Sequence, residues 1–183
     1  MEPTGLILKA ANFAAQKHRN QRRKGIDAAP YINHPIELAN LLWHQANVHD
    51  EITIAAALLH DTVEDTDTTF ADLDLEFGTD VRNVVAEVTD DKSLPKETRK
   101  RLQVEHAPHL SDRARLVKLA DKISNLREVL TSPPEDWSQE RKIAYFNWGK
   151  DVIDQIRGTH ADLERMFDEI YQQGVNQFKE GDT

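Results

Sequence analysis

The chain has no cysteine among its 183 residues. This absence excludes disulfide frameworks, thiolate metal centres and cysteine nucleophiles. Glycine and proline are also scarce, with seven of each, and so few turn-forming residues favour helices over a turn-rich β protein. A chain of this length can bury about 70% of the surface that its unfolded form exposes, so its core needs no covalent crosslink.

Long hydrophobic runs are missing as well. The most apolar stretch, Ile52 to Leu59, is far shorter than the roughly 20 residues that cross a bilayer. The first residues, MEPTGLILKAANFAAQKHRN, lack a basic head followed by an apolar block, so no signal peptide is expected. We therefore expect a cytoplasmic protein that has no membrane partner.

Positive charge is outnumbered by negative charge. Lysine and arginine number 23 against 32 aspartates and glutamates, which gives a formal net charge of -9. This balance argues against nucleic acid as a partner, because the phosphate backbone would be repelled. An anionic small molecule would need local basic groups or a metal ion to hold it against the overall field.

Apolar residues recur at helical spacing, and no convincing alternation typical of a strand is present. The polar residues Asp50, Thr69, Ser111 and Ser138 are placed as helix caps. We expect helices over residues 6–18, 35–43, 51–59, 70–77, 81–88, 95–107, 112–126, 139–156 and 163–178. The prediction is an all-α helical bundle of about eight to ten helices in a single domain, residues 1–183, with its functional core within about 5–150 and a last helix over about 160–179.

The segment HDTVED, residues 60–65, is the densest cluster of side chains that can carry chemistry. It follows directly on the apolar segment ITIAAALL, so polar groups begin where a buried helix ends. On a continuing helix, Glu64 would lie over His60, and Asp65 over Asp61. One imidazole and three carboxylates beside a buried segment are costly without a cation, which favours a metal site. A solvated helix end is the alternative.

Two more segments strengthen the metal interpretation. Asp121 lies among leucines in LVKLADKISNL, where a carboxylate needs a partner. His34 lies between two prolines in PYINHP, at an expected helix start. Two histidines and two aspartates would form a mixed nitrogen and oxygen shell, which suits manganese, iron or zinc better than calcium.

These residues carry a resemblance to a known family. In order and rough spacing, His34, the His60–Asp61 pair and Asp121 match the H…HD…D signature of HD-domain phosphohydrolases. Five segments resemble the hydrolase domain of the RelA/SpoT family in its small stand-alone form: FAAQKHRNQRRKG, PYINHPIELANLL, AALLHDTVEDTDTTFADLDLEFG, VAEVTDDKSLPKETRKRLQ and LVKLADKISNLREV. The resemblance covers roughly residues 5–150, and the insertion IDAAP lengthens one loop.

The resemblance implies a manganese-dependent hydrolase of guanosine 3′,5′-bis(diphosphate), ppGpp, and of pppGpp. Such an enzyme removes the 3′-diphosphate and leaves GDP or GTP. The metal ligands that it implies are His34, His60, Asp61 and Asp121. It also implies that Glu64 and Asp65 position and deprotonate the attacking water, that Arg23 and Lys24 line the nucleotide site, and that Asn125 contacts the base or ribose.

The same chemistry can be argued from the residue types alone. A bound divalent ion makes water a better nucleophile, and nearby carboxylates can accept the proton of that water. Charge that develops on phosphoryl oxygens needs cationic donors, and the candidates beyond the loop are Lys96, Lys100 and Arg141. Tyr145, one turn beyond Arg141, is a further candidate for the substrate site. A solvated basic face for 96–101 and a core position for Tyr145 are the alternatives.

Two other functions stay open from the sequence. The first is another HD-domain nucleotide phosphohydrolase activity, such as NADPH 2′-phosphatase. The second is a metal-binding regulatory module without turnover, although the intact Glu64–Asp65 pair argues against it. His18 is expected to be a structural hydrogen-bonding residue, and His106 and His109 to be loop residues. The sequence leaves the oligomeric state open.

Overall fold

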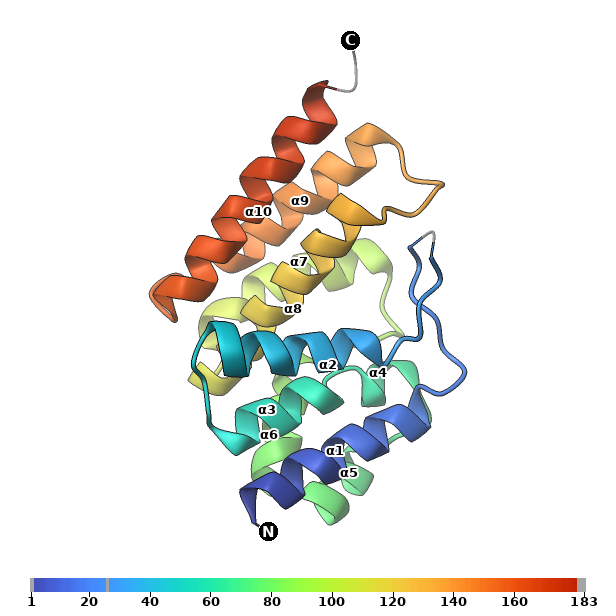
Figure 1. Ribbon diagram of the computed structural model, residues 1–183, viewed down its shortest axis with the longest axis vertical. Helices are drawn as coiled ribbons and strands as arrows, with labels where there is room; N and C mark the ends of the chain where they lie inside the picture. Colours follow the sequence, from blue (N-terminus) through green and yellow to red (C-terminus); the bar gives the residue numbers. More distant parts are fainter. Residues whose placement is uncertain (1, 26, 181–183) are drawn as a thin grey trace.

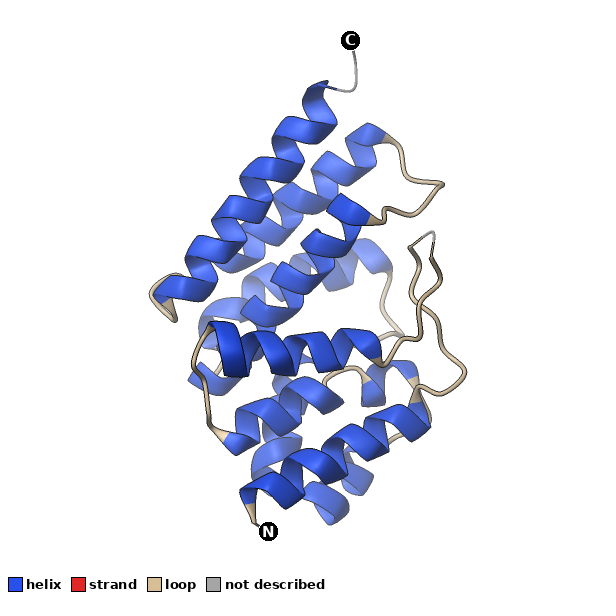
Figure 2. Ribbon diagram, in the orientation of Figure 1, coloured by secondary structure: helices blue, strands red, loops and turns tan. Residues whose placement is uncertain are grey.

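The computed structural model describes residues 2–25 and 27–180, and in these residues it consists of helices and connecting loops without a β-strand (Figure 2). This confirms the all-α prediction. The helices are α1 (Pro3–Lys17), α2 (Asn33–Asn40), α3 (Glu51–Leu59), α4 (Thr62–Asp65), α5 (Phe70–Phe77), α6 (Thr79–Val88), α7 (Lys96–His106), α8 (Asp112–Thr131), α9 (Gln139–Asp154) and α10 (Ala161–Glu180). A π-helical turn, Leu41–Gln45, extends α2, and a 3₁₀ turn, Ala107–His109, follows α7.

Local capping explains why several helices begin where the sequence predicts. Asp50 accepts a hydrogen bond from the Thr53 N–H at 2.9 Å and so begins α3. Thr69 and Asp72 form a reciprocal capping box at the start of α5. Gly78 ends that helix with a φ of 86°, a conformation that other residues rarely adopt.

Helix α3 lies at the centre of the lower half of the molecule, as its apolar sequence predicts (Figure 1). Its residues from Thr53 to Leu59 are all buried, and the helix packs against α1, α2, α6 and α8. Because residues 60–61 directly follow the buried carboxyl end of α3, they lie inside the molecule.

Helix α8 joins the two halves of the structure, of which one contains α1 to α6 and the other contains α9 and α10. One side of α8 packs against α2, α3 and α6, while the other packs against α9 and α10 (Figure 1). Buried residues such as Leu119, Ile123 and Leu126 hold it there. Because Asp121 lies in the middle of this helix, it is placed at the junction of the halves.

Helix α3 ends at Leu59, as predicted, and the helix does not continue unbroken through HDTVED. Residues 60–61 form a turn, and α4 begins at Thr62. The Thr62 hydroxyl donates to the Leu59 carbonyl at 2.7 Å, and the His60 ring contacts the Ala57 carbonyl at 2.8 Å. Side chains thus satisfy the last carbonyls of α3, which a longer helix would otherwise bond through backbone N–H groups.

The remaining differences from the predicted helix bounds are small. The predicted helix over 139–156 ends at Asp154, and the one over 35–43 begins at Asn33 and closes with the π-helical turn. The one over 112–126 continues for five more residues, to Thr131. Within the described parts of the chain, no helix is long and apolar enough to cross a membrane.

Candidate active site

A cavity of about 620 Å³ opens between the two halves of the molecule. The α1–α2 loop, the α3–α4 turn, the α6–α7 segment and helices α7, α8 and α9 all contribute to its walls. Every residue that the sequence analysis proposed for the site lines this one cavity: Arg23, Lys24, His34, His60, Asp61, Glu64, Asp65, Lys96, Lys100, Asp121, Asn125, Arg141 and Tyr145. Residues far apart in the sequence therefore meet as the resemblance implied.

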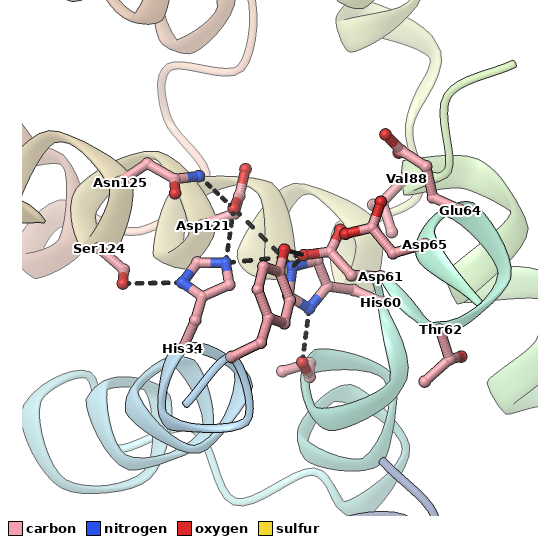
Figure 3. Close-up of polar contacts among 12 residues, drawn as sticks. His34, His60, Asp61, Thr62, Glu64, Asp65, Val88, Asp121, Ser124 and Asn125 are labelled. Atoms are coloured by element: carbon pink, nitrogen blue, oxygen red, sulfur yellow. Dashed lines mark hydrogen bonds and ion pairs between the residues drawn. The ribbon is translucent and has the colours of Figure 1, made fainter. Parts of the chain in front are cut away.

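Two histidines and two aspartates converge at the floor of the cavity (Figure 3). His34, His60 and Asp121 each offer one ligand atom, and these atoms lie within 4.8 Å of one another. The Nε2 atom of His34 lies 3.3 Å from Oδ1 of Asp121. Asp61 stands just outside that trio, with its Oδ2 atom 2.9 Å from Nε2 of His60 and 3.9 Å from Nε2 of His34.

Hydrogen bonds at the other ring nitrogen determine the tautomer of each histidine. Nδ1 of His60 lies 2.8 Å from the carbonyl oxygen of Ala57. A carbonyl oxygen can only accept, so Nδ1 of His60 carries the proton and donates. In the neutral form of the ring, the form that binds a metal, its Nε2 atom then presents a lone pair to the cavity.

His34 is oriented by a chain of two side chains. The Ser124 hydroxyl donates to Oε2 of Glu37 at 2.8 Å, so its oxygen accepts from Nδ1 of His34 at 3.0 Å. The Nε2 atom of His34 is therefore also free of a proton. Both Nε2 atoms are buried and lack a hydrogen-bond partner among the described residues. Two such lone pairs beside carboxylates fit a divalent transition metal.

The electrostatics of the four residues also call for a cation. Burial disfavours the imidazolium form, but Asp61 and Asp121 outweigh it and raise the pKa of His60 to about 9. Burial lowers the pKa of His34 despite its contact with Asp121. The two carboxylates thus draw positive charge into the site, which a proton on His60 or a metal ion can supply.

Each aspartate of the cluster is held by a further donor. The hydroxyl of the partly buried Tyr31 donates to Oδ2 of Asp61. Burial and the charge of Asp61 raise the pKa of Tyr31, so this hydroxyl keeps its proton. Nδ2 of Asn125 donates to Oδ1 of Asp121 at 2.6 Å. Both carboxylates are therefore fixed in orientation.

Glu64 and Asp65 lie beside the cluster, on α4 (Figure 3). Oε2 of Glu64 accepts from the Asp90 N–H at 3.1 Å. Burial, together with the charge of Asp61, raises the pKa of Glu64 to about 7, which suits a group that takes and releases a proton near neutral pH. Asp65 accepts from Nε2 of Gln21 at 2.8 Å and from Nζ of Lys92.

Arg23 is already engaged within the protein. Its guanidinium forms an ion pair with Glu128 and donates to Oδ1 of Asn125 at 2.9 Å. The amide of Asn125 thus links Arg23 to Asp121, so contact of Asn125 with base or ribose stays a prediction. Lys24 lines the same cavity with an exposed side chain.

The wall of the cavity at α7 and α9, across from the α1–α2 loop, combines cationic side chains with aromatic rings. The Arg141 guanidinium lies 4.5 Å from the ring centre of Trp137, and Nζ of Lys100 lies 5.2 Å from that of Trp148. Tyr145 packs between the two tryptophans, at 5.1 Å from Trp137 and 5.4 Å from Trp148. Cationic and stacking groups on one wall suit an anionic nucleotide.

Two buried lysines on α8 also belong to the site, although neither was among the predicted site residues. Lys118 and Lys122 both line the cavity and are 7% and 3% exposed. Nζ of Lys122 lies 3.2 Å from Oδ2 of Asp121 and 4.3 Å from the Trp148 ring centre. Burial lowers the pKa of Lys118. The sequence did contain a sign of their role: the two lysines are four residues apart, on either side of Asp121, in an otherwise apolar stripe.

Such a fold and such a histidine–aspartate cluster define an HD-domain protein. The profile described as HD domain matches residues 10–145 of the chain. Two relatives carry the name guanosine-3′,5′-bis(diphosphate) 3′-pyrophosphohydrolase MESH1. The one from Xenopus tropicalis is 56% identical over 171 residues, 93% of this chain and 96% of its own. The one from Homo sapiens is 54% identical over 167 residues, 91% of this chain and 93% of its own.

A solved structure with a similar fold points to the same family. It is titled as a metazoan ortholog of SpoT that hydrolyses ppGpp and plays a role in starvation responses. Its TM-score to this chain is 0.91 at 49% identity, and the match covers 96% of this chain and 99% of that one. The chain belongs to the HD-domain family and, within it, to the RelA/SpoT-related group that these relatives represent.

Proposed function

We propose that the chain is a guanosine-3′,5′-bis(diphosphate) 3′-diphosphatase, which hydrolyses ppGpp to GDP and pppGpp to GTP, with release of pyrophosphate. The observation that carries the proposal is that one cavity holds the Glu64–Asp65 pair, two aspartates and two buried imidazole nitrogens, for which residues 2–25 and 27–180 supply no hydrogen-bond partner. The relatives named for this activity match more than nine tenths of the chain. The cytoplasmic location and the single-domain organisation stay predictions.

The resident ion that we propose is Mn²⁺, held by His34, His60, Asp61 and Asp121. When bound, a divalent ion lowers the pKa of water and polarises a phosphoryl oxygen. The protein supplies fixed ligand geometry, because Ala57, Ser124, Tyr31 and Asn125 orient the four side chains.

Glu64 and Asp65 handle the attacking water in this proposal. The water oxygen bonds to the phosphorus that carries the ribose 3′ oxygen, and the bond between that phosphorus and the 3′ oxygen breaks. Glu64 takes the proton from the water, the 3′ oxygen leaves as a hydroxyl with a proton from solvent, and Glu64 then returns its proton to solvent. The two phosphates depart together as pyrophosphate, so one water is consumed for each nucleotide.

Substrate binding falls to the basic side chains of the cavity. Lys24 and Arg23 lie on the loop side, whereas Lys96, Lys100 and Arg141 lie on the side of α7 and α9. We propose that these groups hold the phosphates against the overall charge of -9, with Tyr145 and Asn125 at the nucleoside. Burial and the neighbouring Lys100 and Arg141 lower the pKa of Lys96, which shows how closely positive charge is gathered there.

One panel of substrates tests the proposal. The protein, loaded with Mn²⁺, is incubated separately with ppGpp, pppGpp, NADPH and deoxynucleotides, and the products are separated by chromatography. We expect GDP or GTP and intact pyrophosphate from the first two. Release of orthophosphate from NADPH alone, or no product from any substrate in protein with measured bound metal, would overturn it.

A further inference from the structure

A chain of hydrogen bonds runs from a buried histidine to Asp65. His18 follows α1 directly and is only 2% exposed. Its Nδ1 atom lies 2.7 Å from Oε1 of Gln21, and Nε2 of Gln21 lies 2.8 Å from Oδ2 of Asp65. Gln21 and Asp65 line the cavity, whereas His18 lies behind them.

The chemistry of the three groups decides which atom donates and which accepts in each of these hydrogen bonds. An ionised carboxylate has no proton to give, so Gln21 must turn its NH₂ group toward Asp65. The amide oxygen of Gln21 then faces His18 and needs a donor. His18 therefore carries a proton on Nδ1, and each bond of the chain points from His18 toward Asp65.

The chain is anchored at both ends. The backbone N–H of His18 bonds to Ala14 and its carbonyl accepts from the Gln21 N–H, both at 2.9 Å. The His18 ring packs 4.8 Å from that of Tyr31, whose hydroxyl holds Asp61. At the other end, the Asp65 N–H bonds to the Asp61 carbonyl at 2.9 Å.

Asp65 and Glu64 differ in how their oxygens are used. Both oxygens of Asp65 accept hydrogen bonds, Oδ2 from Gln21 and Oδ1 from Lys92. Glu64 accepts one hydrogen bond, at Oε2 from Asp90, in the described residues, and its Oε1 has Arg99 at 3.7 Å. Asp65 is thus held in one orientation, and Glu64 keeps an oxygen that can receive a proton.

We propose that His18 and Gln21 are positioning residues, which hold Asp65 where it directs the attacking water while Glu64 accepts the proton. The inference rests on the proposed hydrolytic function. Partners that orient metal ligands are typically worth about 10–100-fold in activity, and we expect a loss of the same order for partners that orient Asp65. The alternative is that these hydrogen bonds only stabilise the loop after α1 and have no effect on catalysis.

Kinetics of matched variants separate these two roles. Gln21→Met keeps the length of the side chain but removes both hydrogen bonds, and kcat should fall ~10–100-fold while KM and bound Mn²⁺ stay within about two-fold. Gln172→Met is the control, because Gln172 is an exposed glutamine on α10 whose side chain bonds to Asn176 and to no other described residue. A merely structural role predicts lower thermal stability with an unchanged kcat for the folded fraction.

Further variants test whether His18 is the donor to Gln21 and whether Asp65 is the residue that these hydrogen bonds orient. His18→Asn places an NH₂ donor near the former Nδ1 and should retain most activity, whereas His18→Leu should lose as much as Gln21→Met. In an Asp65→Ala background the Gln21→Met change should cost nothing further, because its target is gone. An equal loss of kcat in both backgrounds would overturn the proposal.

A measurement without substrate keeps the inference distinct from the proposed function. In protein with ¹⁵N-labelled histidine, the His18 signal, assigned by its loss in His18→Asn, should show the Nδ1–H tautomer and shift in Gln21→Met. The Nε2–H tautomer in the parent protein would overturn the proposal. If the parent fails to hydrolyse ppGpp but shows the Nδ1–H tautomer, the proposed function fails and the chain of hydrogen bonds stands.

Discussion

Nε2 of His34 lies 3.3 Å from Oδ1 of Asp121, although His34 is the second residue of α2 and Asp121 lies in the middle of α8. Ser124 makes this approach possible, because its hydroxyl bonds to both His34 and Glu37, and both belong to α2. The bonds that orient the imidazole are therefore the same bonds that fasten α2 to α8. Assembly of the site and packing of these two helices are one event.

Removal of the Ser124 hydroxyl should consequently weaken metal binding. In Ser124→Ala the Nδ1 proton of His34 loses its acceptor, so the ring is less firmly held and Mn²⁺ affinity should fall ~10–100-fold. At saturating Mn²⁺, kcat should stay near that of the parent. Titration with the ion, followed by activity, measures both, and Ser93→Ala at an exposed position is the control. Unchanged affinity would remove Ser124 from this role.

Asp121→Asn should abolish both metal uptake and turnover. The substitution keeps the shape of the side chain but removes one of the two negative charges that draw a cation to the histidines. Bound Mn²⁺ is measured by elemental analysis beside ppGpp hydrolysis. Asp112→Asn, an exposed aspartate on the same helix, is the matched control. Full activity with unchanged metal content would show that Asp121 is not a ligand.

Local signals in the sequence explain which features could be predicted. Caps such as Asp50 and Thr69 act within three residues, so they mark helix starts without knowledge of the tertiary fold. The turn at His60 escaped prediction because it depends on side chains that bond back to carbonyls of α3. The link from Gln21 to Asp65 escaped for a related reason, since it joins two segments that only packing brings together.

Electrostatic steering should depend chiefly on Lys24. Arg23 is paired with Glu128, whereas Lys24 is exposed at the cavity. Lys24→Ala should raise KM and flatten the dependence of kcat/KM on salt, because an unscreened positive charge near the entrance is lost. Arg19→Ala removes an equal charge from an exposed position that does not line the cavity. The same salt slope in both variants would show that the loop charge is merely solvated.

In the metal-free protein, Glu64 should make stability depend on pH. Burial, with the charge of Asp61 beside it, raises the pKa of Glu64 from 4.5 to about 7. The folded state therefore holds this proton more tightly than the unfolded state, so its contribution to stability is complete below about pH 4.5 and is lost as pH rises through 7. Urea unfolding should show that Glu64→Gln gains stability over the parent between pH 5 and 8. A difference that is constant across this range would contradict the burial of Glu64.

Replacement of Glu64 also separates proton transfer from metal binding. Gln keeps the shape of the side chain and can still bond to the Asp90 N–H, but it cannot accept a proton. Turnover should then fall by about 10²–10⁴, or roughly 3–5 kcal/mol of barrier, while metal content and KM change little. Glu169→Gln, at an exposed position on α10, should leave kcat unchanged. If Glu64→Gln loses its metal, Glu64 is a ligand and the role of Asp61 must be reconsidered. If its kcat stays near that of the parent, Asp65 is the base, and the hydrogen bonds from Gln21 and Lys92 must open for it to act.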